Sequence, residues 1–334
     1  MVKIGKVDIA EFPLMLAPME DVSDPPFRAL CKEFGADLMY TEFISTDGLI
    51  RNADKSVKKL DIYEDERPIG IQIFGSDFDA MIGSAEIVEA AKPCLLDINY
   101  GCPVKKVVCK EAGAGILKNI PKMIALTEAV IKATSLPVTV KTRLGWDEST
   151  INIVEVAERL QDIGVQALSI HARTRVQMYK GHSDWSWINK VKANPRLTIP
   201  VFGNGDIDSP QKAWEYKNNY NVDGIMIGRG AIGNPWIFRE VKHYFKHQTE
   251  LPPPDIHERI YAVQKHLKRA IEWKGLVLGL LETRMHYAAY FKGLDGVKEY
   301  RARLVNTLDY QEILDILEEM REKYGNQQLS SNVV

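Results

Sequence analysis

Eight short apolar runs, rich in β-branched residues, alternate along the chain with stretches that have the apolar spacing of helices. Apolar runs of this length predict strands that are buried on both faces, as in a parallel sheet. The stretches between them, such as 79–91, 122–134, 151–163 and 209–218, repeat apolar residues every three or four positions. This order predicts an α/β fold, most directly a (β/α)8 TIM barrel. The runs are residues 14–18, 38–43, 69–74, 95–100, 138–143, 167–172, 199–203 and 224–228.

The residues that follow these runs bear on the alternative fold, an open doubly wound sheet. Polar or glycine-rich residues come after nearly every run, including Glu42, Gln72, Asn99 and Lys141. A barrel builds its active site from the carboxyl ends of many strands, whereas an open sheet concentrates it at one or two switch points. The sequence therefore favours the barrel.

The alternation of strands and helices stops after Phe245. Leu251 and three prolines follow, and they favour an extended connector. Helical patterns then occupy 256–273, 278–291, 297–307 and 310–323. We predict a catalytic barrel at 1–245, a Pro-rich linker at 246–254, an all-helical domain at 255–326 and a flexible tail at 327–334.

Overall charge does not indicate a nucleic-acid partner, because 43 Lys and Arg residues stand against 45 Asp and Glu residues. Such a partner would need locally gathered charge. Between Lys242 and Arg303, twelve basic residues outnumber seven acidic ones, and five histidines lie among them. We interpret this segment as a phosphate-binding surface, with a solvated helical face as the alternative.

The four cysteines form no C-x-x-C pair, which argues against a zinc ribbon, and a chain of 334 residues needs no disulfides. We therefore expect a cytoplasmic protein. The first ten residues lack the apolar run of a signal peptide. No stretch approaches the roughly 18 apolar residues of a membrane helix, so we expect no membrane attachment.

One cysteine lies in a distinctive turn. The fourth run ends in Asp97-Ile-Asn-Tyr-Gly-Cys-Pro103, followed by the glycine-rich segment 111–117. Above a barrel mouth, the Cys102 thiol could deliver a proton or attack a substrate, and the alternative is a small packing residue. The remaining cysteines have no such context and are interpreted as packing residues: Cys31, Cys94 and Cys109.

Two neighbouring strand ends carry cations. Lys141 and Arg143 share one face of a strand, because side chains repeat every two residues, and together they suit an anion. His171 and Arg173 repeat this arrangement one strand later. The alternatives are solvated strand-end charges and a structural histidine.

The last two strands end in Phe202-Gly-Asn-Gly-Asp206 and Ile227-Gly-Arg-Gly230. Glycines let backbone N–H groups approach a ligand, and barrels commonly bind phosphate between these strand ends. Residues 228–233 also spell G-x-G-x-x-G, but Pro235 interrupts the next helix and the motif comes last, which disfavours a Rossmann site. Phosphate loops, cations, amides and a thiol fit FMN better than a metal ion, and we expect no metal.

Six motifs between residues 14 and 245 carry a family resemblance. They are Leu16-Ala-Pro-Met-Glu-Asp-Val-Ser-Asp-Pro-Pro-Phe-Arg28, Asp97-Ile-Asn-Tyr-Gly-Cys-Pro103, Val138-Thr-Val-Lys-Thr-Arg-Leu-Gly145, His171-Ala-Arg-Thr-Arg175, Gly203-Asn-Gly-Asp206 and Gly228-Arg-Gly-Ala-Ile-Gly-Asn-Pro-Trp-Ile-Phe238. In this order they resemble the tRNA-dihydrouridine synthases, most closely the bacterial B-type branch.

The resemblance implies an enzyme that passes hydride from NADPH, or NADH, to FMN and reduces the C5–C6 bond of uridine in tRNA. It implies that Cys102 donates a proton to C5 and that Asn99 faces the flavin or the uracil. We expect Arg173, together with Arg284 and Lys292 of the basic segment, to contact tRNA, and we expect a monomer. The implied FMN-binding residues are Ala17, Pro18, Met19, Gln72, Lys141, His171, Asn204, Gly205, Asp206, Gly228 and Arg229.

The chemistry of uracil agrees with these roles. Its C5–C6 bond is conjugated to the C4 carbonyl, so hydride adds at C6 and the resulting enolate must be protonated at C5. A thiol, with an ordinary pKa of roughly 8.5, is mostly protonated at neutral pH and can supply that proton. Lys141 near the flavin N1–C2 edge would stabilise the reduced ring.

Two other functions compete with this interpretation. A small-molecule FMN reductase of the dihydroorotate or dihydropyrimidine type would share the barrel, the flavin and the acid. The basic helical segment and the Gly-Cys-Pro turn argue against it. The second is an RNA-binding protein with a vestigial barrel, which the intact set of Cys102, Lys141 and His171 disfavours.

Overall fold

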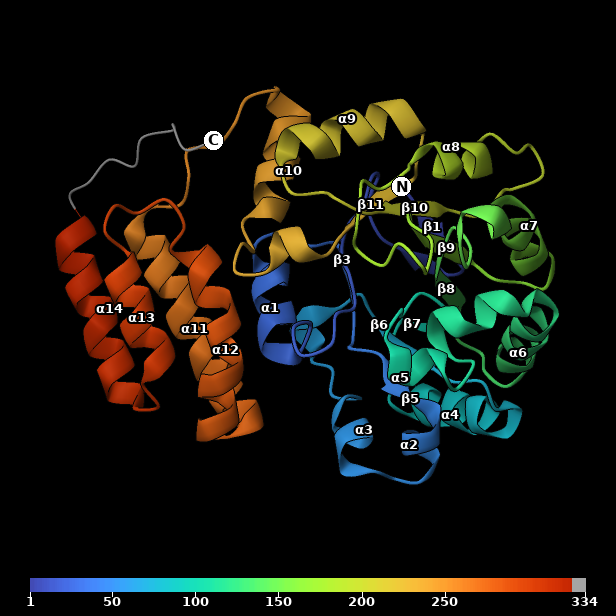
Figure 1. Ribbon diagram of the computed structural model, residues 1–334, viewed down its shortest axis with the longest axis horizontal. Coiled ribbons are helices and arrows are strands. Elements are labelled where there is room, and N and C mark those ends of the chain that lie inside the picture. The colour runs from blue at the N-terminus through green and yellow to red at the C-terminus, as the bar shows by residue number, and fades with distance from the viewer. Residues whose placement is uncertain (326–334) are drawn as a thin grey trace.

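The computed structural model describes residues 1–325, and within them eight parallel strands close into a barrel (Figure 1). Strand β4 pairs with both β3 and β6, which closes the ring and excludes an open sheet. The prediction of a TIM barrel is therefore confirmed. The barrel strands are β3 (Leu14–Leu16), β4 (Leu38–Tyr40), β6 (Ile69–Phe74), β7 (Leu95–Asn99), β8 (Val138–Arg143), β9 (Ala167–His171), β10 (Val201–Asn204) and β11 (Gly224–Ile227).

Seven of the eight predicted runs contain their whole strand, and β6 and β8 have the predicted bounds, while β10 ends one residue beyond its run, at Asn204. Strand β10 begins at Val201, later than predicted, because Pro200 has no N–H with which to enter the ladder. Three short strands were not predicted. Strand β5 (Ile44–Ser45) pairs with β6, while β1 (Lys3–Ile4) and β2 (Val7–Asp8) form a hairpin. The hairpin covers the amino end of the barrel, where Ile4 joins the core cluster of Met15 and Leu38.

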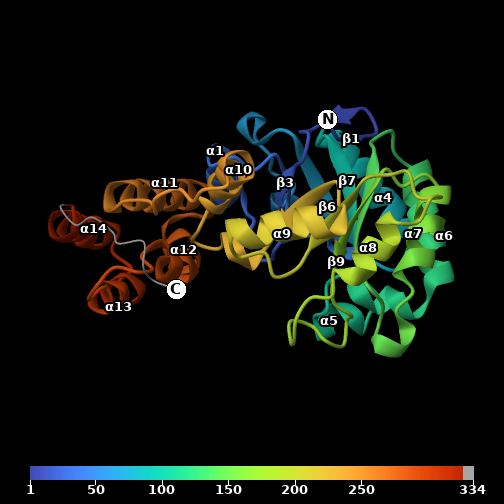
Figure 2. The same cartoon turned by 90° about the horizontal axis from the view of Figure 1, so that it is seen from above.

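Helices cover the outside of the barrel (Figure 2). Their apolar faces pack on the strands, as in α7, where Ile153, Val156 and Leu160 are buried. Asp24, Asp77 and other caps accept bonds from first-turn N–H groups and fix where helices begin. The α-helices are α1 (Pro25–Glu33), α2 (Thr46–Ile50), α3 (Asp54–Lys58), α4 (Phe78–Ala90), α5 (Lys105–Val108), α6 (Ile120–Lys132), α7 (Ile153–Asp162), α8 (Ser186–Lys192), α9 (Pro210–Tyr220) and α10 (Ile237–His247).

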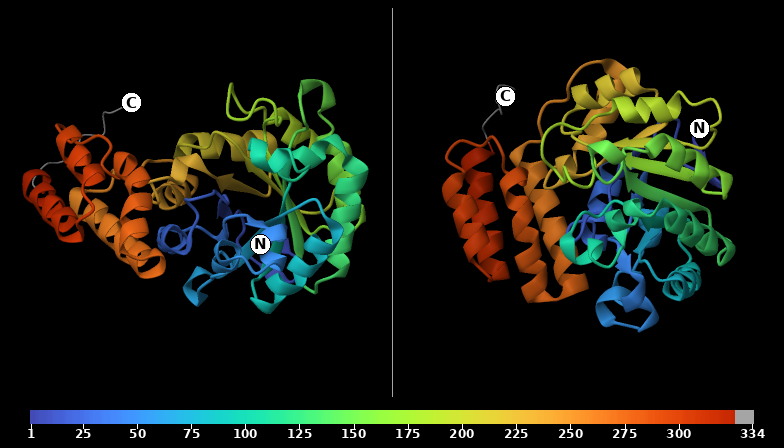
Figure 3. Two further views of the ribbon diagram at one scale, coloured as in Figure 1. Left: turned by 60° about the horizontal axis from the view of Figure 1, so that its bottom comes forward. Right: turned by 45° about the vertical axis from the view of Figure 1, so that its right-hand side comes forward.

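Up to residue 325, four further helices form a bundle beside the barrel, next to α1 (Figure 3). Their core includes Leu267, Leu280 and Leu317, and it also takes in Phe34 and Trp236 from the barrel side. Helix α10 extends to His247, slightly beyond the predicted barrel boundary. The division into domains stays a prediction, and the predicted tail at 327–334 lies outside the described residues. The helices are α11 (Ile256–Lys274), α12 (Leu276–Tyr290), α13 (Lys298–Asn306) and α14 (Tyr310–Tyr324).

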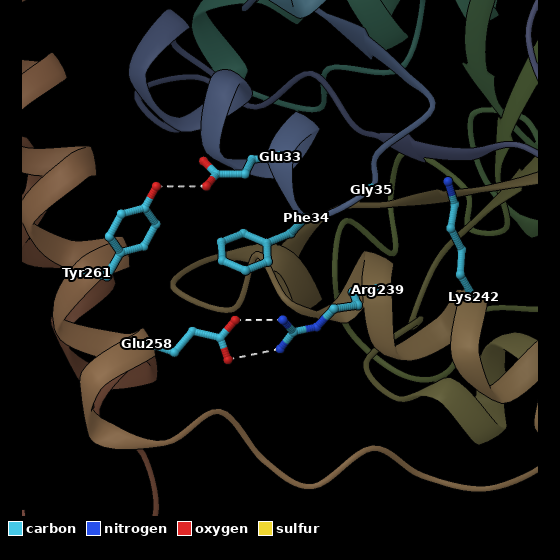
Figure 4. Close-up of a pocket in the computed structure, with 7 residues that line it drawn as sticks. All are labelled: Glu33, Phe34, Gly35, Arg239, Lys242, Glu258 and Tyr261. Atoms are coloured by element: carbon cyan, nitrogen blue, oxygen red, sulfur yellow. Dashed lines mark hydrogen bonds and ion pairs between the residues drawn. The ribbon is translucent and has the colours of Figure 1, made fainter. Parts of the chain in front are cut away.

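Ion pairs join the bundle to the barrel around a shallow cavity of about 460 Å³ (Figure 4). The Arg239 guanidinium donates to both carboxylate oxygens of Glu258, at 2.6 and 3.0 Å. Glu33 accepts from the Tyr261 hydroxyl at 2.9 Å and from Lys265 at 2.6 Å. Two further pairs across the junction are Arg269 with Asp65 and Lys274 with Asp24, while Lys242 of α10 pairs with Asp37 on the barrel side. Three of the twelve basic residues of the segment, Lys265, Arg269 and Lys274, therefore bind the barrel.

None of the helices in the described part of the chain is both long and apolar enough to cross a membrane.

Close packing beneath the barrel mouth yields a stability prediction. A Cβ atom at Gly203 would overlap the indole ring of buried Trp185, whose Nε1 donates to the Gly205 carbonyl at 3.1 Å. We expect Gly203→Ala to lower the free energy of unfolding by roughly 1–3 kcal/mol, since overpacking forces the neighbours to shift. Urea denaturation measures this, with Gly83→Ala in α4 as the control because its new methyl group would meet nothing closer than 3.4 Å. Equal losses in both variants would contradict the prediction.

Candidate active site

A cavity of about 700 Å³ opens at the carboxyl ends of the barrel strands. Its walls come from residues after β3, β7, β8, β9, β10 and β11, which the parallel order brings to one end. Most of the predicted site residues line it. They are Ala17, Pro18, Met19, Asn99, Cys102, Lys141, His171, Asn204, Gly205, Asp206, Gly228 and Arg229.

The turn that carries Cys102 is held by a chain of side-chain hydrogen bonds. The amide oxygen of Asn99 accepts from the backbone N–H groups of Gly101 and Cys102, both at 2.9 Å. The Asn99 amide nitrogen donates to Gln72 at 2.8 Å, and Gln72 in turn donates to Asp97 at 2.5 Å. Gln72 is fully buried. Gln72 thus helps to orient the turn through its hydrogen bond with Asn99.

Cys102 is 7% exposed, and burial raises the pKa of its thiol. The backbone N–H of Val104 and the Arg143 guanidinium oppose this shift only in part. The thiol is therefore protonated at neutral pH and faces the cavity. Among the other cysteines, Cys31 is buried as predicted, but Cys109 is exposed, so the interpretation of Cys109 as a packing residue is wrong. It follows the short helix α5, which leaves it at the surface.

Lys141 and His171 approach the cavity from neighbouring strands. Lys141 Nζ donates to the Asn204 side-chain oxygen at 3.5 Å, and burial, with the nearby Arg143, lowers the pKa of Lys141 to about 8. Burial also lowers the pKa of His171 well below its usual value, and Arg143 and Lys141 add to the effect. At neutral pH the lysine thus remains a cation, whereas the histidine is a neutral donor or acceptor.

Two buried arginines hold the loop 174–183 over one side of the cavity. Arg143 donates to the carbonyls of Thr174 and Met178, at 3.0 and 2.9 Å. Arg173 donates to the Gly181 carbonyl at 2.6 Å and to Asp206 at 2.7 Å. Arg173 is only 2% exposed and does not line the cavity, so its direct contact with RNA is not favoured by this geometry.

Tyr179, at the tip of this loop, is a cavity residue that the sequence analysis did not identify. Its ring is 52% exposed and lies between two guanidinium groups, 5.7 Å from that of Arg143 and 5.0 Å from that of Arg229. It lies eight residues beyond the His171 strand end, in a segment without apolar periodicity. The position in sequence therefore carried no signal for this role.

A second cavity, of about 840 Å³, continues from the first towards the helical bundle. Both are lined by Cys102 and Phe43, and the second reaches Trp273 and Leu278. Exposed basic side chains surround this second cavity, which makes its edge suitable for a polyanion. They are Arg51, Lys55, Lys58, Lys106 and Lys110.

The lining of the second cavity includes three carboxylates that the fold brings within 4.8 Å of one another, Glu20, Asp21 and Glu42. Their distance in sequence left this cluster undetected. Glu20 pairs with Lys59 at 2.6 Å, and Glu42 accepts from the Asp21 N–H at 2.5 Å. Burial raises the pKa of Glu42 to about 7, so this carboxyl is partly protonated at neutral pH. The partial protonation, together with the Lys59 ammonium and the Asp21 N–H, explains how three carboxylates can lie so close together.

The two predicted tRNA contacts of the helical bundle lie away from both cavities. Arg284 is half-buried in α12, and its guanidinium donates to the Thr307 carbonyl at 2.8 Å. Lys292 is exposed just beyond the end of α12. Arg284 thus ties α12 to the end of α13, while the Lys292 side chain forms no hydrogen bond or ion pair with residues 1–325.

Comparison with known proteins assigns the family. A profile described as Dihydrouridine synthase (Dus) matches residues 15–327. The tRNA-dihydrouridine synthase B of Pseudomonas putida is 39% identical over 302 residues, covering 90% of this chain and 89% of that protein. A probable tRNA-dihydrouridine synthase of Rickettsia prowazekii is 37% identical over 302 residues, covering 90% of this chain and 91% of the relative.

Among solved structures, histamine dehydrogenase from Rhizobium sp. 4-9 has a TM-score of 0.57 at 11% identity, which reflects a shared fold. The match covers 80% of this chain and 50% of that structure, so this chain spans about half the length of that relative. The profile and the two closer sequences, in contrast, extend over the barrel and the helical bundle together. By these matches and by the motifs at its barrel mouth, the chain belongs to the dihydrouridine synthase family.

Proposed function

We propose that the chain binds FMN in the 700 Å³ cavity and reduces uridines of tRNA to 5,6-dihydrouridine. NADPH is the proposed hydride source, with NADH as an alternative. The observation that carries the proposal is that a buried, protonated thiol and a lysine cation face the same cavity as two glycine-rich strand ends. This combination suits a phosphate-bearing redox cofactor beside a carbon that must be protonated.

The cavity has the groups that FMN requires. The backbone around Gly205, Gly228 and Arg229 would hold the phosphate between the last two strands. Lys141, which donates to an amide oxygen, would lie at the pyrimidine edge of the ring and stabilise negative charge there. Once reduced by the nicotinamide nucleotide, bound FMN would supply the hydride that is added to uracil C6.

Cys102 would hold the proton that the uracil C5 carbon receives. The Asn99 amide keeps the two N–H groups of its turn in place, so the thiol direction is set by the strand network beneath it. Burial keeps the proton on Sγ until a strongly basic carbon arises next to it. The neutral His171 offers a hydrogen bond to the pyrimidine without adding a second acid.

The second cavity provides a path for the RNA chain. Its basic edge would contact phosphates, while the opening beside Cys102 would admit one unstacked base. We propose a monomer that acts in the cytoplasm, because one chain supplies both cavities and all four cysteines are free thiols. No metal ion is needed for this chemistry.

The test is the formation of dihydrouridine in an unmodified tRNA transcript that is incubated with purified protein, FMN and NADPH. Mass spectrometry of the digested RNA should show uridines heavier by two hydrogens, and NADPH should be consumed in equal amount. Free uridine at the same nucleoside concentration is the control and should not be reduced, because it lacks the phosphates that the basic edge would hold. Comparable reduction of free uridine would favour a small-molecule reductase instead.

A further inference from the structure

The loop 228–233, which follows the last barrel strand, is enclosed between the end of β10 and helix α12. A Cβ atom at Gly230 would overlap the Ile207 carbonyl oxygen, on the β10 side. A Cβ atom at Gly233 would overlap the His286 carbonyl oxygen and lie 2.8 Å from the Ala289 methyl group, on the α12 side. The helical bundle thus forms one wall of a loop whose other end, at Gly228 and Arg229, lines the cofactor cavity.

A buried hydrogen bond joins the loop to this wall. The Gly233 N–H donates to His286 Nδ1 at 3.0 Å, and the His286 side chain is only 2% exposed. Gly233 has a φ of +61°, a left-handed conformation that exposes its N–H to the helix. Because Nδ1 accepts, the ring carries its proton on Nε2. Burial and the neighbouring His266 lower the pKa of His286 well below its usual value, which keeps Nδ1 available.

The position of His286 is set by rigid neighbours. Its ring packs on Phe27 of α1, with centroids 4.7 Å apart, and on His266 of α11 at the same distance. The Lys274 ammonium reaches from the end of α11 to the buried carboxylate of Asp24 at 2.5 Å. The helix that carries His286 is therefore fixed relative to the barrel, and the loop takes its geometry from that helix.

We propose that His286 is a positioning residue for the flavin phosphate, through its hydrogen bond to the Gly233 N–H. The inference rests on the proposed FMN site. Removing the acceptor leaves a buried N–H without a partner, and a loop in that state relaxes towards other conformations. The backbone groups at Gly228 and Arg229 would then no longer be held in place for the phosphate.

The experiment compares FMN with riboflavin, which has the same ring but no phosphate. Apoprotein is titrated with each flavin, and binding is followed by quenching of flavin fluorescence. We expect His286→Leu to weaken FMN binding about ten-fold, the order of magnitude for a lost partner of a buried donor. Riboflavin binding should change little. His286→Asn places an oxygen on Cγ where Nδ1 was and should bind FMN nearly as wild type does.

Tyr290→Phe is the matched control from the same helix. It removes the hydroxyl that pairs with His266 Nδ1 at 3.0 Å but leaves the loop bond intact. It should lower thermal stability without changing the preference for FMN over riboflavin. Ala289→Val is the second loop variant, since its larger side chain crowds Gly233 from the same wall. It should reduce that preference even if His286→Leu does not fold.

Three results would count against the proposal. If His286→Leu or Ala289→Val weakens both flavins equally, the residues act on overall structure. If His286→Asn loses FMN as strongly as His286→Leu, an acceptor at this place is not what matters. If the wild-type protein binds neither flavin, the proposed function itself fails, and that outcome is separate from the other two.

Discussion

Replacing Cys102 by alanine should slow the reoxidation of reduced enzyme by tRNA by about 10²- to 10⁴-fold, the usual contribution of a positioned acid. Cys102 is 7% exposed at the cavity wall, and burial raises the pKa of its thiol. The thiol therefore keeps its proton at neutral pH and can donate it to the substrate. Reduction by NADPH does not need that proton and should keep its rate. Stopped-flow absorbance of the flavin measures both half-reactions.

Cys109→Ala is the control for this experiment. Cys109 lies on the same segment of chain but is exposed, beyond the short helix α5. Its removal should leave both half-reactions unchanged, which separates loss of the acid from loss of a thiol in general. Reoxidation of the Cys102 variant at the wild-type rate would show that another group protonates C5.

The second large effect is expected in tRNA binding. Lys55 of α3 and Lys106 of α5 are exposed side chains that line the second cavity. If each contacts a phosphate, the double variant Lys55→Ala, Lys106→Ala should reduce the slope of log affinity against log salt by about two. Filter binding over a salt series gives this slope, and the affinity should fall for every tRNA sequence alike.

Lys6→Ala is the control, because Lys6 is exposed in the β1–β2 hairpin at the amino end of the barrel, away from the cavities. Lys292→Ala tests the helical bundle separately. An unchanged slope in the double variant, together with a reduced slope in Lys292→Ala, would move the RNA contact from the cavity edge to the bundle. Arg284 is unsuitable for this comparison because its guanidinium already binds the Thr307 carbonyl.

The barrel and the residues at its mouth could be predicted because both depend on short, local sequence patterns. A parallel strand that is buried on both faces needs a continuous apolar run, and each of the eight strands lies within one such run or ends one residue beyond it. Residues just after such strands must meet at one end of a barrel. Cys102, Lys141 and Asp206 could therefore be assigned to one cavity although they lie far apart in sequence.

Which polar side chain reaches the cavity depended on packing between distant segments. Gln72 stays a predicted FMN contact, but the structure adds that its amide is fully buried between Asp97 and Asn99 of the next strand. Arg173 is buried because its guanidinium binds Asp206 and loop carbonyls. Tyr179 reaches the cavity because buried arginines hold its loop there.

The charges of the helical segment show the same difference between what the sequence determines and what the tertiary structure decides. Its basic excess is a property of sequence, yet Lys265, Arg269 and Lys274 pair with carboxylates of the barrel more than 200 residues away in the chain. A charge is free or paired according to what docks against it, and that depends on how α11 packs on α1. Sequence alone determined the order of elements and the chemical groups at the barrel mouth. Only the tertiary structure decided which groups face ligand and which hold the protein together, because hydrogen bonds and ion pairs form between neighbours in space.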